Sequence, residues 1–252
     1  MNIMICGFCG KMGQTVYNTA KNFNDINVVE GLDRQEAIDD YRCEVQALKL
    51  ISNINDATKC DVVVDFSHFS LTKTVLDFCV KNKKPLVLAT TGITKEDEQN
   101  IIDASKVIPV FRSSNMSEGV FVLLNLINKA TQMLEGWDIE IIEKHHSHKA
   151  DAPSGTGVMM LNEVKSQRNG VEAVYGRNPS SSRRAPQEIG LHSVRGGGVV
   201  GEHEINFFNE HETIKISHEA FSKGIFAEGA LKAAKFIYGK QAGLYTMKNL
   251  FD

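Results

Sequence analysis

The sequence lacks the marks of nucleic-acid-binding and membrane-spanning proteins. Its 252 residues carry 28 basic and 31 acidic side chains, a formal net charge of -3, so it has no basic surplus with which to bind a nucleic acid. It contains no apolar run of about 18 residues or more, the length that a membrane-spanning helix requires. We therefore expect neither a nucleic acid nor a membrane as a partner, and one large or two smaller globular domains.

Cysteine is scarce, and the N-terminus shows no secretion signal. Residues 1–7 lack a basic region and a long apolar core, so they predict a first strand instead of a signal peptide. The five cysteines are odd in number and have no zinc-binding spacing, which favours a cytoplasmic location, free thiols and no bound metal. Cys6 and Cys9 form a C-x-x-C sequence, but Cys6 ends the strand, whereas a redox-active pair begins a helix.

Strand and helix patterns alternate over the first 115 or so residues. The predicted strands are residues 3–6, 27–32, 61–66, 85–88 and 107–111, and the predicted helices are residues 11–23, 70–80 and one that starts with a capping box at Thr94. Repeated strand–helix units predict a Rossmann-like, doubly wound parallel sheet. In such a sheet a ligand binds at the carboxyl ends of the strands.

The pattern then changes to a second, α+β domain. Helices are predicted at residues 120–134 and 155–168, a strand at 139–143, and alternating strands at 188–195, 199–208 and 212–220. Residues 176–187 predict a mobile loop, and residues 225–238 a C-terminal helix that rejoins the first domain. The sequence therefore predicts one domain of residues 1–116 plus 224–252, and an inserted domain of residues 117–223.

A glycine-rich turn follows the first strand and opens a helix. Residues 7–13 read G-x-x-G-x-x-G, in which glycine permits a tight turn and the close approach of a diphosphate. Asp33, about twenty residues further on, can accept hydrogen bonds from the adenosine ribose, and Arg34 can pair with a 2′-phosphate. The turn can also be purely structural. We expect it to bind NADH or NADPH, without deciding between them, through Gly7, Phe8, Cys9, Gly10, Lys11, Met12, Asp33 and Arg34.

Two further strand ends carry small residues that can contact the nicotinamide ribose or amide. The candidates are Ala89, Thr90, Thr91, Ser113, Ser114, Asn115 and Met116. Ordinary strand-to-helix turns with Ser and Thr caps explain these residues equally well.

The most informative stretch is residues 143–156, which read EKHHSHKADAPSGT. A metal site, a solvated polar loop and an anion site with a general acid are the alternatives. Adjacent histidines rarely chelate one ion without a further ligand at defined spacing, so the metal interpretation is minor. We favour the anion site, because Lys149 supplies a fixed charge, histidine donates a proton near pH 7, and Ser-Gly-Thr begins a helix whose N–H groups suit a carboxylate.

This stretch resembles the signature of the dihydrodipicolinate reductase family, which acts in the diaminopimelate route to lysine. The resemblance covers nearly the whole chain and includes residues 7–13, 89–92, 114–117, 194–197, 200–203 and 226–230. It implies NAD(P)H-dependent reduction of 4-hydroxy-tetrahydrodipicolinate to tetrahydrodipicolinate. Hydride is added at C4, the 4-hydroxyl is lost as water, and a protonated side chain quenches the resulting enamine.

The resemblance also implies roles for individual residues. His145 corresponds to the proton donor and Lys149 to the second catalytic residue. His146, Lys149, Gly155 and Thr156 correspond to positions that bind the carboxylates of the small dicarboxylate substrate. The first domain and the C-terminal helix would bind the cofactor, and the inserted domain would bind substrate and form a homotetramer.

Two positions depart from the family pattern. Ala89 stands where the family commonly has Gly, and Lys223 where many members have Arg.

Two other functions are considered. The first alternative is another two-domain NAD(P)-dependent reductase. An acylating semialdehyde dehydrogenase would need a catalytic Cys, and the candidates Cys60 and Cys79 lie in apolar runs, which argues against it. A non-catalytic dinucleotide sensor is the second. The other histidines are expected to be satisfied by local hydrogen bonds: His68, His192, His203, His211 and His218.

Overall fold

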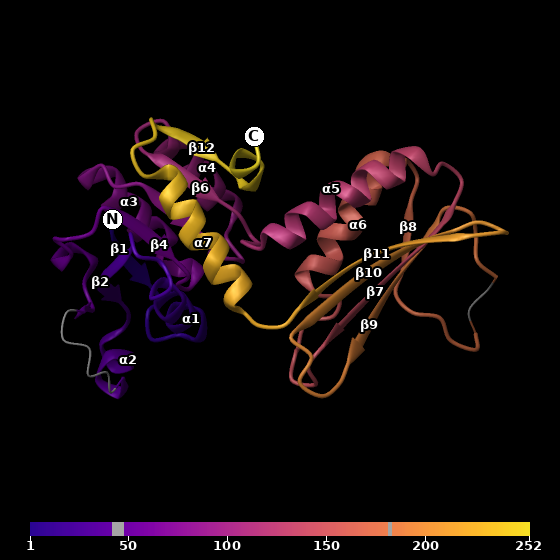
Figure 1. Ribbon diagram of the computed structural model, residues 1–252, viewed down its shortest axis with the longest axis horizontal. Coiled ribbons are helices and arrows are strands. Elements are labelled where there is room, and N and C mark those ends of the chain that lie inside the picture. The colour runs from indigo at the N-terminus through magenta and orange to yellow at the C-terminus, as the bar shows by residue number, and fades with distance from the viewer. Residues whose placement is uncertain (42–47, 181–182) are drawn as a thin grey trace. The chain divides into compact units, whose positions relative to one another are not determined.

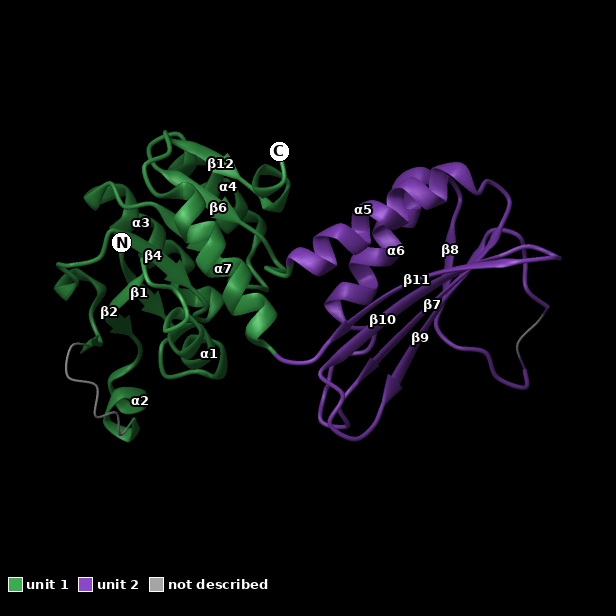
Figure 2. Ribbon diagram, viewed as in Figure 1, with its two compact units in different colours: residues 1–117, 223–252 green, residues 118–222 purple. Residues whose placement is uncertain are grey.

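The computed structural model describes residues 1–41, 48–180 and 183–252. These residues form two compact units, Met1–Ser117 with Lys223–Asp252 (unit 1) and Glu118–Ser222 (unit 2), coloured separately in Figure 2. One of the five cysteines, Cys43, and residues 181–182 of the predicted loop lie outside the described residues. Among the described helices, none combines the length and the apolar character needed to cross a membrane.

Unit 1 contains a seven-stranded, all-parallel sheet among its described residues (Figure 1). Its order is β12-β6-β5-β4-β1-β2-β3. The order reverses between β1 and β4, and ligands bind at such a switch point. The strands are β1 (Asn2–Cys6), β2 (Asn27–Leu32), β3 (Lys49–Ile51), β4 (Val62–Asp65), β5 (Leu86–Leu88), β6 (Pro109–Arg112) and β12 (Gly243–Tyr245). The predicted doubly wound parallel sheet is confirmed.

Helices cover both faces of this sheet. They are α1 (Lys11–Ala20), α2 (Gln35–Asp40), α3 (Thr72–Asn82), α4 (Lys95–Ser105) and α7 (Gly224–Ile237), with short 3-10 turns at Ile54–Asp56, Phe69–Leu71 and Met247–Leu250. Helices α1 and α7 contact each other, as do α3 and α4. Alternate strand residues such as Met4, Val63 and Leu86 form a core with apolar residues of α3 and α4. The β-branched β4 is buried along its whole length, as expected for a central parallel strand.

The described residues of unit 2 form a mixed five-stranded sheet, in order β11-β10-β7-β9-β8, and two helices that pack on it (Figure 1). The strands are β7 (Asp138–His145), β8 (Glu172–Val174), β9 (Glu188–Arg195), β10 (Gly201–Phe208) and β11 (Thr213–Ala220), and the helices are α5 (Glu118–Met133) and α6 (Gly155–Gln167). Strand β10 is antiparallel to β7 and β11, whereas β9 is parallel to β7 and β8. Ile139, Ile141, Ile205 and Phe207 form a core with residues of both helices.

The opposite side of this sheet is here called the open face. Because side chains alternate along a strand, residues next to the buried ones point to this side. The open face carries Glu140, Ile142, Lys144, His192, Val194, Glu202, Glu204 and Lys215. The alternating strands predicted at residues 188–195, 199–208 and 212–220 correspond to β9, β10 and β11 of this sheet.

Candidate functional site

The glycine-rich turn of unit 1 is shaped so that side chains cannot enter it. Gly7 has a φ of +76°, and a Cβ there would lie 2.8 Å from the Phe66 oxygen. A Cβ on Gly13 would lie 2.2 Å from the Gly7 oxygen. Gly10 is the N-cap of α1 and provides no side-chain cap. The turn and the positive end of α1 therefore fit an anionic group such as a diphosphate.

Asp33 is fixed next to this turn. One carboxylate oxygen accepts the Cys9 N–H at 2.8 Å and the other accepts the Arg34 N–H at 2.9 Å. The turn and Asp33 line one pocket of about 620 Å³, whose lining residues are Gly7, Cys9, Gly10, Asp33, Arg34, Ala37, Phe66, Ser67, His68, Ser70 and Leu71. The residues from Phe66 onward follow β4 at the switch point. Sequence reasoning assigned none of them to the cofactor, although their place after a buried strand was a usable signal. His68 was expected to form a local hydrogen bond, and its Nδ1 lies 2.9 Å from the Ser70 hydroxyl.

Three residues predicted to bind the cofactor at the glycine-rich turn, Phe8, Lys11 and Met12, do not line this pocket. Phe8 is fully buried, and its ring packs edge-on against Tyr17 and Tyr41. Its side chain therefore stabilises the turn by packing in the interior of the unit, where it cannot contact a ligand. Lys11 is exposed and Met12 half-buried, both in the first turn of α1.

The predicted turn after β5 is tied to the end of β4. Thr90 is buried, and its hydroxyl donates to Asp65 at 3.0 Å and to the Ser67 carbonyl at 3.2 Å. Asp65 is also buried, and this burial raises the pKa of its carboxyl group. Ala89 is buried beside Thr90, whereas Thr91 is exposed. This arrangement leaves Thr91 as the accessible side chain of the turn.

The predicted turn after β6 is held by its own polar groups. The Ser113 hydroxyl donates to the Asn115 carbonyl at 2.5 Å, and Asn115 accepts the Ser117 N–H at 2.9 Å. Ser114 is exposed, and Met116 is buried. The structure thus keeps Ser113–Asn115 in a defined conformation at the carboxyl end of β6.

In unit 2, the carboxyl end of β7 presents His145 beside a buried carboxylate. His145 Nδ1 lies 2.6 Å from Glu143 Oε2, and the Glu143 side chain is fully buried. Arg195 of β9 donates to both oxygens of Glu143, at 2.8 and 2.7 Å. The Ser154 N–H donates to the same carboxylate at 3.1 Å. In the part of the chain that is described, His145 Nε2 makes no hydrogen bond, which leaves it for a ligand.

The charges in this cluster shift the pKa values of its members. Burial alone would raise the pKa of Glu143, but hydrogen bonds from Arg195, Ser193 and His145 outweigh it and lower the pKa to about 2. Burial lowers the pKa of His145, and the Glu143 carboxylate opposes this effect. His203 packs edge-on against His145 at 5.1 Å, and burial followed by repulsion from His145 lowers its pKa to about 4.

Lys149 and the start of α6 complete the predicted substrate set. Lys149 Nζ lies 2.8 Å from Asp151, and its charge acts on His145 by lowering the pKa of the imidazole. Ser154 caps α6 by accepting the Gly157 N–H at 3.1 Å, so Gly155 and Thr156 form the first helical turn. The Nδ1 atom of His146 is buried without a hydrogen-bond partner within the described ranges.

Sequence reasoning missed three residues of this cluster. Glu143 and Arg195 were not assigned a role, and His203 was expected to bond locally. His203 Nε2 instead lies 3.2 Å from the hydroxyl of Ser154, which is 49 residues away. Glu143 could have been found, because it precedes His145 by two residues on the same face of one strand.

The cluster can bind the carboxylate of a ligand and donate a proton to that ligand. It offers an imidazole paired with a carboxylate, an ammonium group and a helix N-terminus. Over residues 1–41, 48–180 and 183–252, no three His, Cys, Asp or Glu side chains are placed to hold a metal ion. Cys60 and Cys79 are buried, and burial raises the pKa of Cys60 to about 11, which suits neither as a nucleophile.

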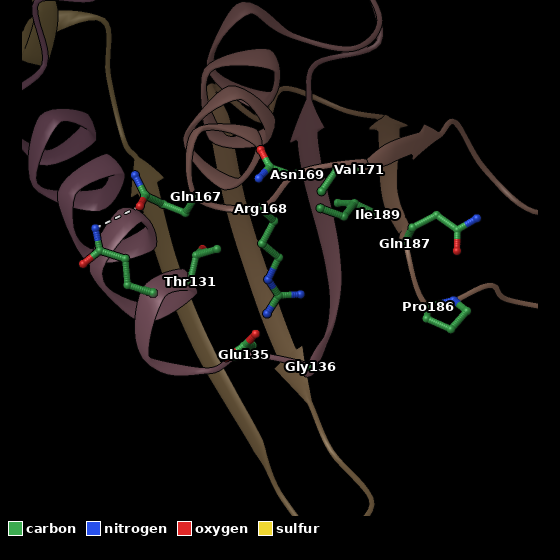
Figure 3. A pocket seen from close by; sticks show the side chains of 11 residues that line it. Thr131, Glu135, Gly136, Gln167, Arg168, Asn169, Val171, Pro186, Gln187 and Ile189 are labelled. Carbon is green, nitrogen blue, oxygen red and sulfur yellow. Dashed lines mark hydrogen bonds between the residues drawn. The ribbon is translucent and has the colours of Figure 1, made fainter.

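A pocket in unit 2 lies near the start of β7, at the end opposite His145, and none of the predicted site residues lines it. This pocket of about 670 Å³ is lined by the ends of α5 and α6 and the start of β9 (Figure 3). Arg168 donates there to the carbonyls of Leu134 and Trp137 at 2.6 and 2.8 Å. The guanidinium thus caps the chain after α5.

Comparison with known proteins finds matches to one family over nearly the whole chain. Family models described as "Dihydrodipicolinate reductase, N-terminus" and "C-terminus" match residues 1–116 and 119–251. A 4-hydroxy-tetrahydrodipicolinate reductase of Caldanaerobacter subterraneus subsp. tengcongensis is 43% identical, covering 99% of this chain and 98% of the relative. One of Clostridium tetani is 41% identical, covering 98% and 95%. A dipicolinate-bound dihydrodipicolinate reductase structure from Paenisporosarcina sp. TG-14 has a TM-score of 0.83 at 22% identity, covering 99% and 98%, and shows the shared fold.

Proposed function

The chain belongs to the dihydrodipicolinate reductase family, and from this premise we infer that it reduces 4-hydroxy-tetrahydrodipicolinate to tetrahydrodipicolinate with NADH or NADPH. It is thus an oxidoreductase of the diaminopimelate route to lysine. The observation that carries the inference is the cluster at the end of β7. There one short stretch supplies His145, Lys149 and the N-terminus of α6.

We propose that residues 1–116 with 224–252 form the dinucleotide-binding domain. The glycine-rich turn supports this role, because a Cβ at Gly7 or Gly13 would collide with backbone atoms and open the tight turn that brings the N-terminus of α1 to a diphosphate. Bound NADH or NADPH supplies the hydride. Asp33 suits the ribose hydroxyls and the exposed Arg34 suits a 2′-phosphate, so the pair serves either cofactor. The turns at Ala89–Thr91 and Ser113–Met116 are assigned to the same cofactor.

We propose that residues 117–223 bind the substrate. His146, Lys149, Gly155 and Thr156 hold its carboxylates, which are stabilised by the ammonium charge and the positive end of α6. The buried, unpartnered Nδ1 of His146 supports its part in this set.

His145 is assigned as the proton donor and Lys149 as the second catalytic residue. Hydride added at C4 of the ring places negative charge on a conjugated nitrogen–carbon system, and the Lys149 ammonium stabilises that charge. The 4-hydroxyl has left as water before this addition, because C4 accepts hydride only as part of a C=C bond conjugated to the ring imine. Protonated His145 then donates its proton to the enamine carbon. Glu143 supports this role, because it accepts a hydrogen bond from His145 Nδ1 at 2.6 Å and favours the charged imidazole.

We further propose that the chain forms a homotetramer in the cytoplasm. Assembly through the open face of unit 2 is supported by Ile142 and the 47% exposed Val194, which lie among charged residues on a sheet surface. Cys6, Cys60 and Cys79 are buried as free thiols, which supports a reducing compartment.

The decisive assay follows NAD(P)H absorbance with enzymatically generated 4-hydroxy-tetrahydrodipicolinate. The wild-type chain is expected to oxidise NADH or NADPH, and His145→Ala is expected to lower turnover by a factor of about 10² or more. Lys165→Ala, an exposed lysine on α6, is the control and should behave as wild type. Absence of oxidation with both cofactors would contradict the proposal and favour a dinucleotide sensor.

A further inference from the structure

We propose that Glu143, held by Arg195, is the positioning residue that sets the ring orientation and the protonation of His145. The proposal rests on the proposed function, since it explains how that histidine acts as an acid. Strand geometry carries it first. Glu143 and His145 are two residues apart on one face of β7, and parallel pairing places Arg195 of β9 opposite His145.

The contact at Nδ1 determines which ring nitrogen can act. An ionised carboxylate only accepts hydrogen bonds, so the His145 Nδ1 atom, 2.6 Å from Glu143, must carry a proton. Nε2 is then the atom that exchanges a proton with a ligand. The low pKa of about 2 keeps Glu143 ionised at every physiological pH. The pair therefore selects one tautomer and orients the ring.

The same carboxylate joins the other parts of the site. It accepts the N–H of Ser154, the N-cap of α6. Arg195, while bound to Glu143, also donates to the Asp151 carbonyl at 2.7 Å. The Asp151 carboxylate in turn pairs with Lys149. One buried anion thus links the acid, the start of the anion-binding helix and the loop that carries the catalytic lysine.

The charges around His145 make Glu143 decisive for its titration. Lys149 from the loop, Arg195 from β9 and His203 from β10 are positive or neutral, and Glu143 from β7 is the anion. Removal of that anion leaves the imidazolium beside the positive charges of Lys149 and Arg195 without its own carboxylate partner, although Asp151 still pairs with Lys149. Removal of Arg195 does the reverse, because it deletes a positive charge and keeps the anion.

Two substitutions therefore have opposite expected effects on the pH profile of kcat. Glu143→Gln should lower kcat about tenfold or more near neutral pH and move the alkaline limb to lower pH, with little change in KM for the cofactor. Arg195→Gln should move that limb to higher pH. If Glu143 had only a structural role, the alkaline limb would stay in place in both variants, or would move in the same direction in both.

The opposite face of β7 offers a matched control. Glu140 is also bonded to a histidine and an arginine, with His192 Nε2 at 2.7 Å and Arg184 Nε at 3.3 Å. Glu140→Gln removes the same kind of charge cluster away from His145. The alkaline limb should then stay where it is in the wild type.

Nitrogen NMR of the His145 imidazole tests the proposal without turnover. We expect an Nδ1-protonated ring in the wild type, and titration at lower pH in Glu143→Gln. If Glu143→Gln does not fold, two measurements still test the proposal: the tautomer of His145 in the wild type, and the position of the alkaline limb of kcat in Arg195→Gln. A wild-type chain without activity would refute the proposed function alone. An active wild type whose Nδ1 is unprotonated, or an active Glu143→Gln variant with an unshifted limb, would overturn the positioning role.

Discussion

At the scale of single residues, Lys149 is the side chain on which the chemistry should depend most. Its side chain is only 21% exposed and its ammonium group is held by Asp151, so the charge is fixed in position. We expect Lys149→Ala to lower kcat by about 10² or more, with a modest loss of cofactor affinity. Steady-state kinetics and NADH titration measure the two effects separately. Near-normal turnover would contradict the assignment, and Lys165→Ala again serves as the control.

His203 should make the fold sensitive to acid. Its pKa is about 4 in the folded chain, below the ordinary 6.5, so the unfolded chain binds its proton first. Stability should therefore fall as the pH drops from about 6.5 to 4, by about 3 kcal/mol from this residue. His203→Gln cannot titrate and should flatten the curve in this window. Urea unfolding at several pH values measures the slope, and equal slopes for both proteins would refute the role.

Local sequence predicted some site residues and could not predict others. Gly13, Asp33 and His145 stand next to a strand end or a helix start, and a local sequence pattern there predicts the role of each residue. Arg195 is different, because its partner lies 52 residues away and is fixed by the register of β7 and β9. No neighbouring residue indicates that register. The side chains that tune the acid were therefore visible only in the folded chain.

At the scale of elements, pattern length decided what could be predicted. The strands at residues 27–32 and 188–195 were predicted with the observed bounds, and the capping box at Thr94 is present before α4. The short elements α2, β3, β8 and β12 were not predicted. They have three to six residues, too few for a helical or alternating period to show.

The packing of α1 against the glycine-rich turn can be tested at Gly13. A Cβ there would lie 2.2 Å from the Gly7 oxygen and 2.6 Å from the Phe8 oxygen. Because both neighbours are backbone atoms, Gly13→Ala must displace the turn. We expect a loss of stability of about 2 kcal/mol or more and weaker NADH binding.

Thermal unfolding and a fluorescence titration with NADH measure these effects. Gly198→Ala is the control, because a Cβ at Gly198 would meet no atom within 4 Å. The same stability and affinity in both variants would show that the close approach at Gly13 is unnecessary.

At the scale of the whole molecule, the chain builds one unit, leaves it after residue 117, and returns at residue 223. Alternating strand and helix patterns predicted the parallel sheet, because right-handed crossovers permit few other arrangements. The order of the second sheet was not predictable in this way. Strand β9 pairs parallel to β7 across a long connection, whereas β10 and β11 form an antiparallel pair.

That strand order leaves an open face whose burial in an assembly can be tested. Ile142 lies at its centre, paired with Glu204 on one side and His192 on the other. If four chains associate through this face, Ile142→Asp would bury a new carboxylate beside Glu204, which carries a large desolvation cost. We expect the variant to sediment as a smaller species than the wild type while each chain stays folded.

Ile102→Asp provides the matched control, since Ile102 is 44% exposed on α4 and belongs to unit 1, whereas the open face belongs to unit 2. It should sediment as the wild type does. A wild type that remains monomeric at every concentration would contradict the tetramer itself. A tetrameric wild type with an equally tetrameric Ile142→Asp variant would instead place the contact elsewhere on the chain, because a carboxylate at the centre of a buried sheet face cannot be accommodated without cost.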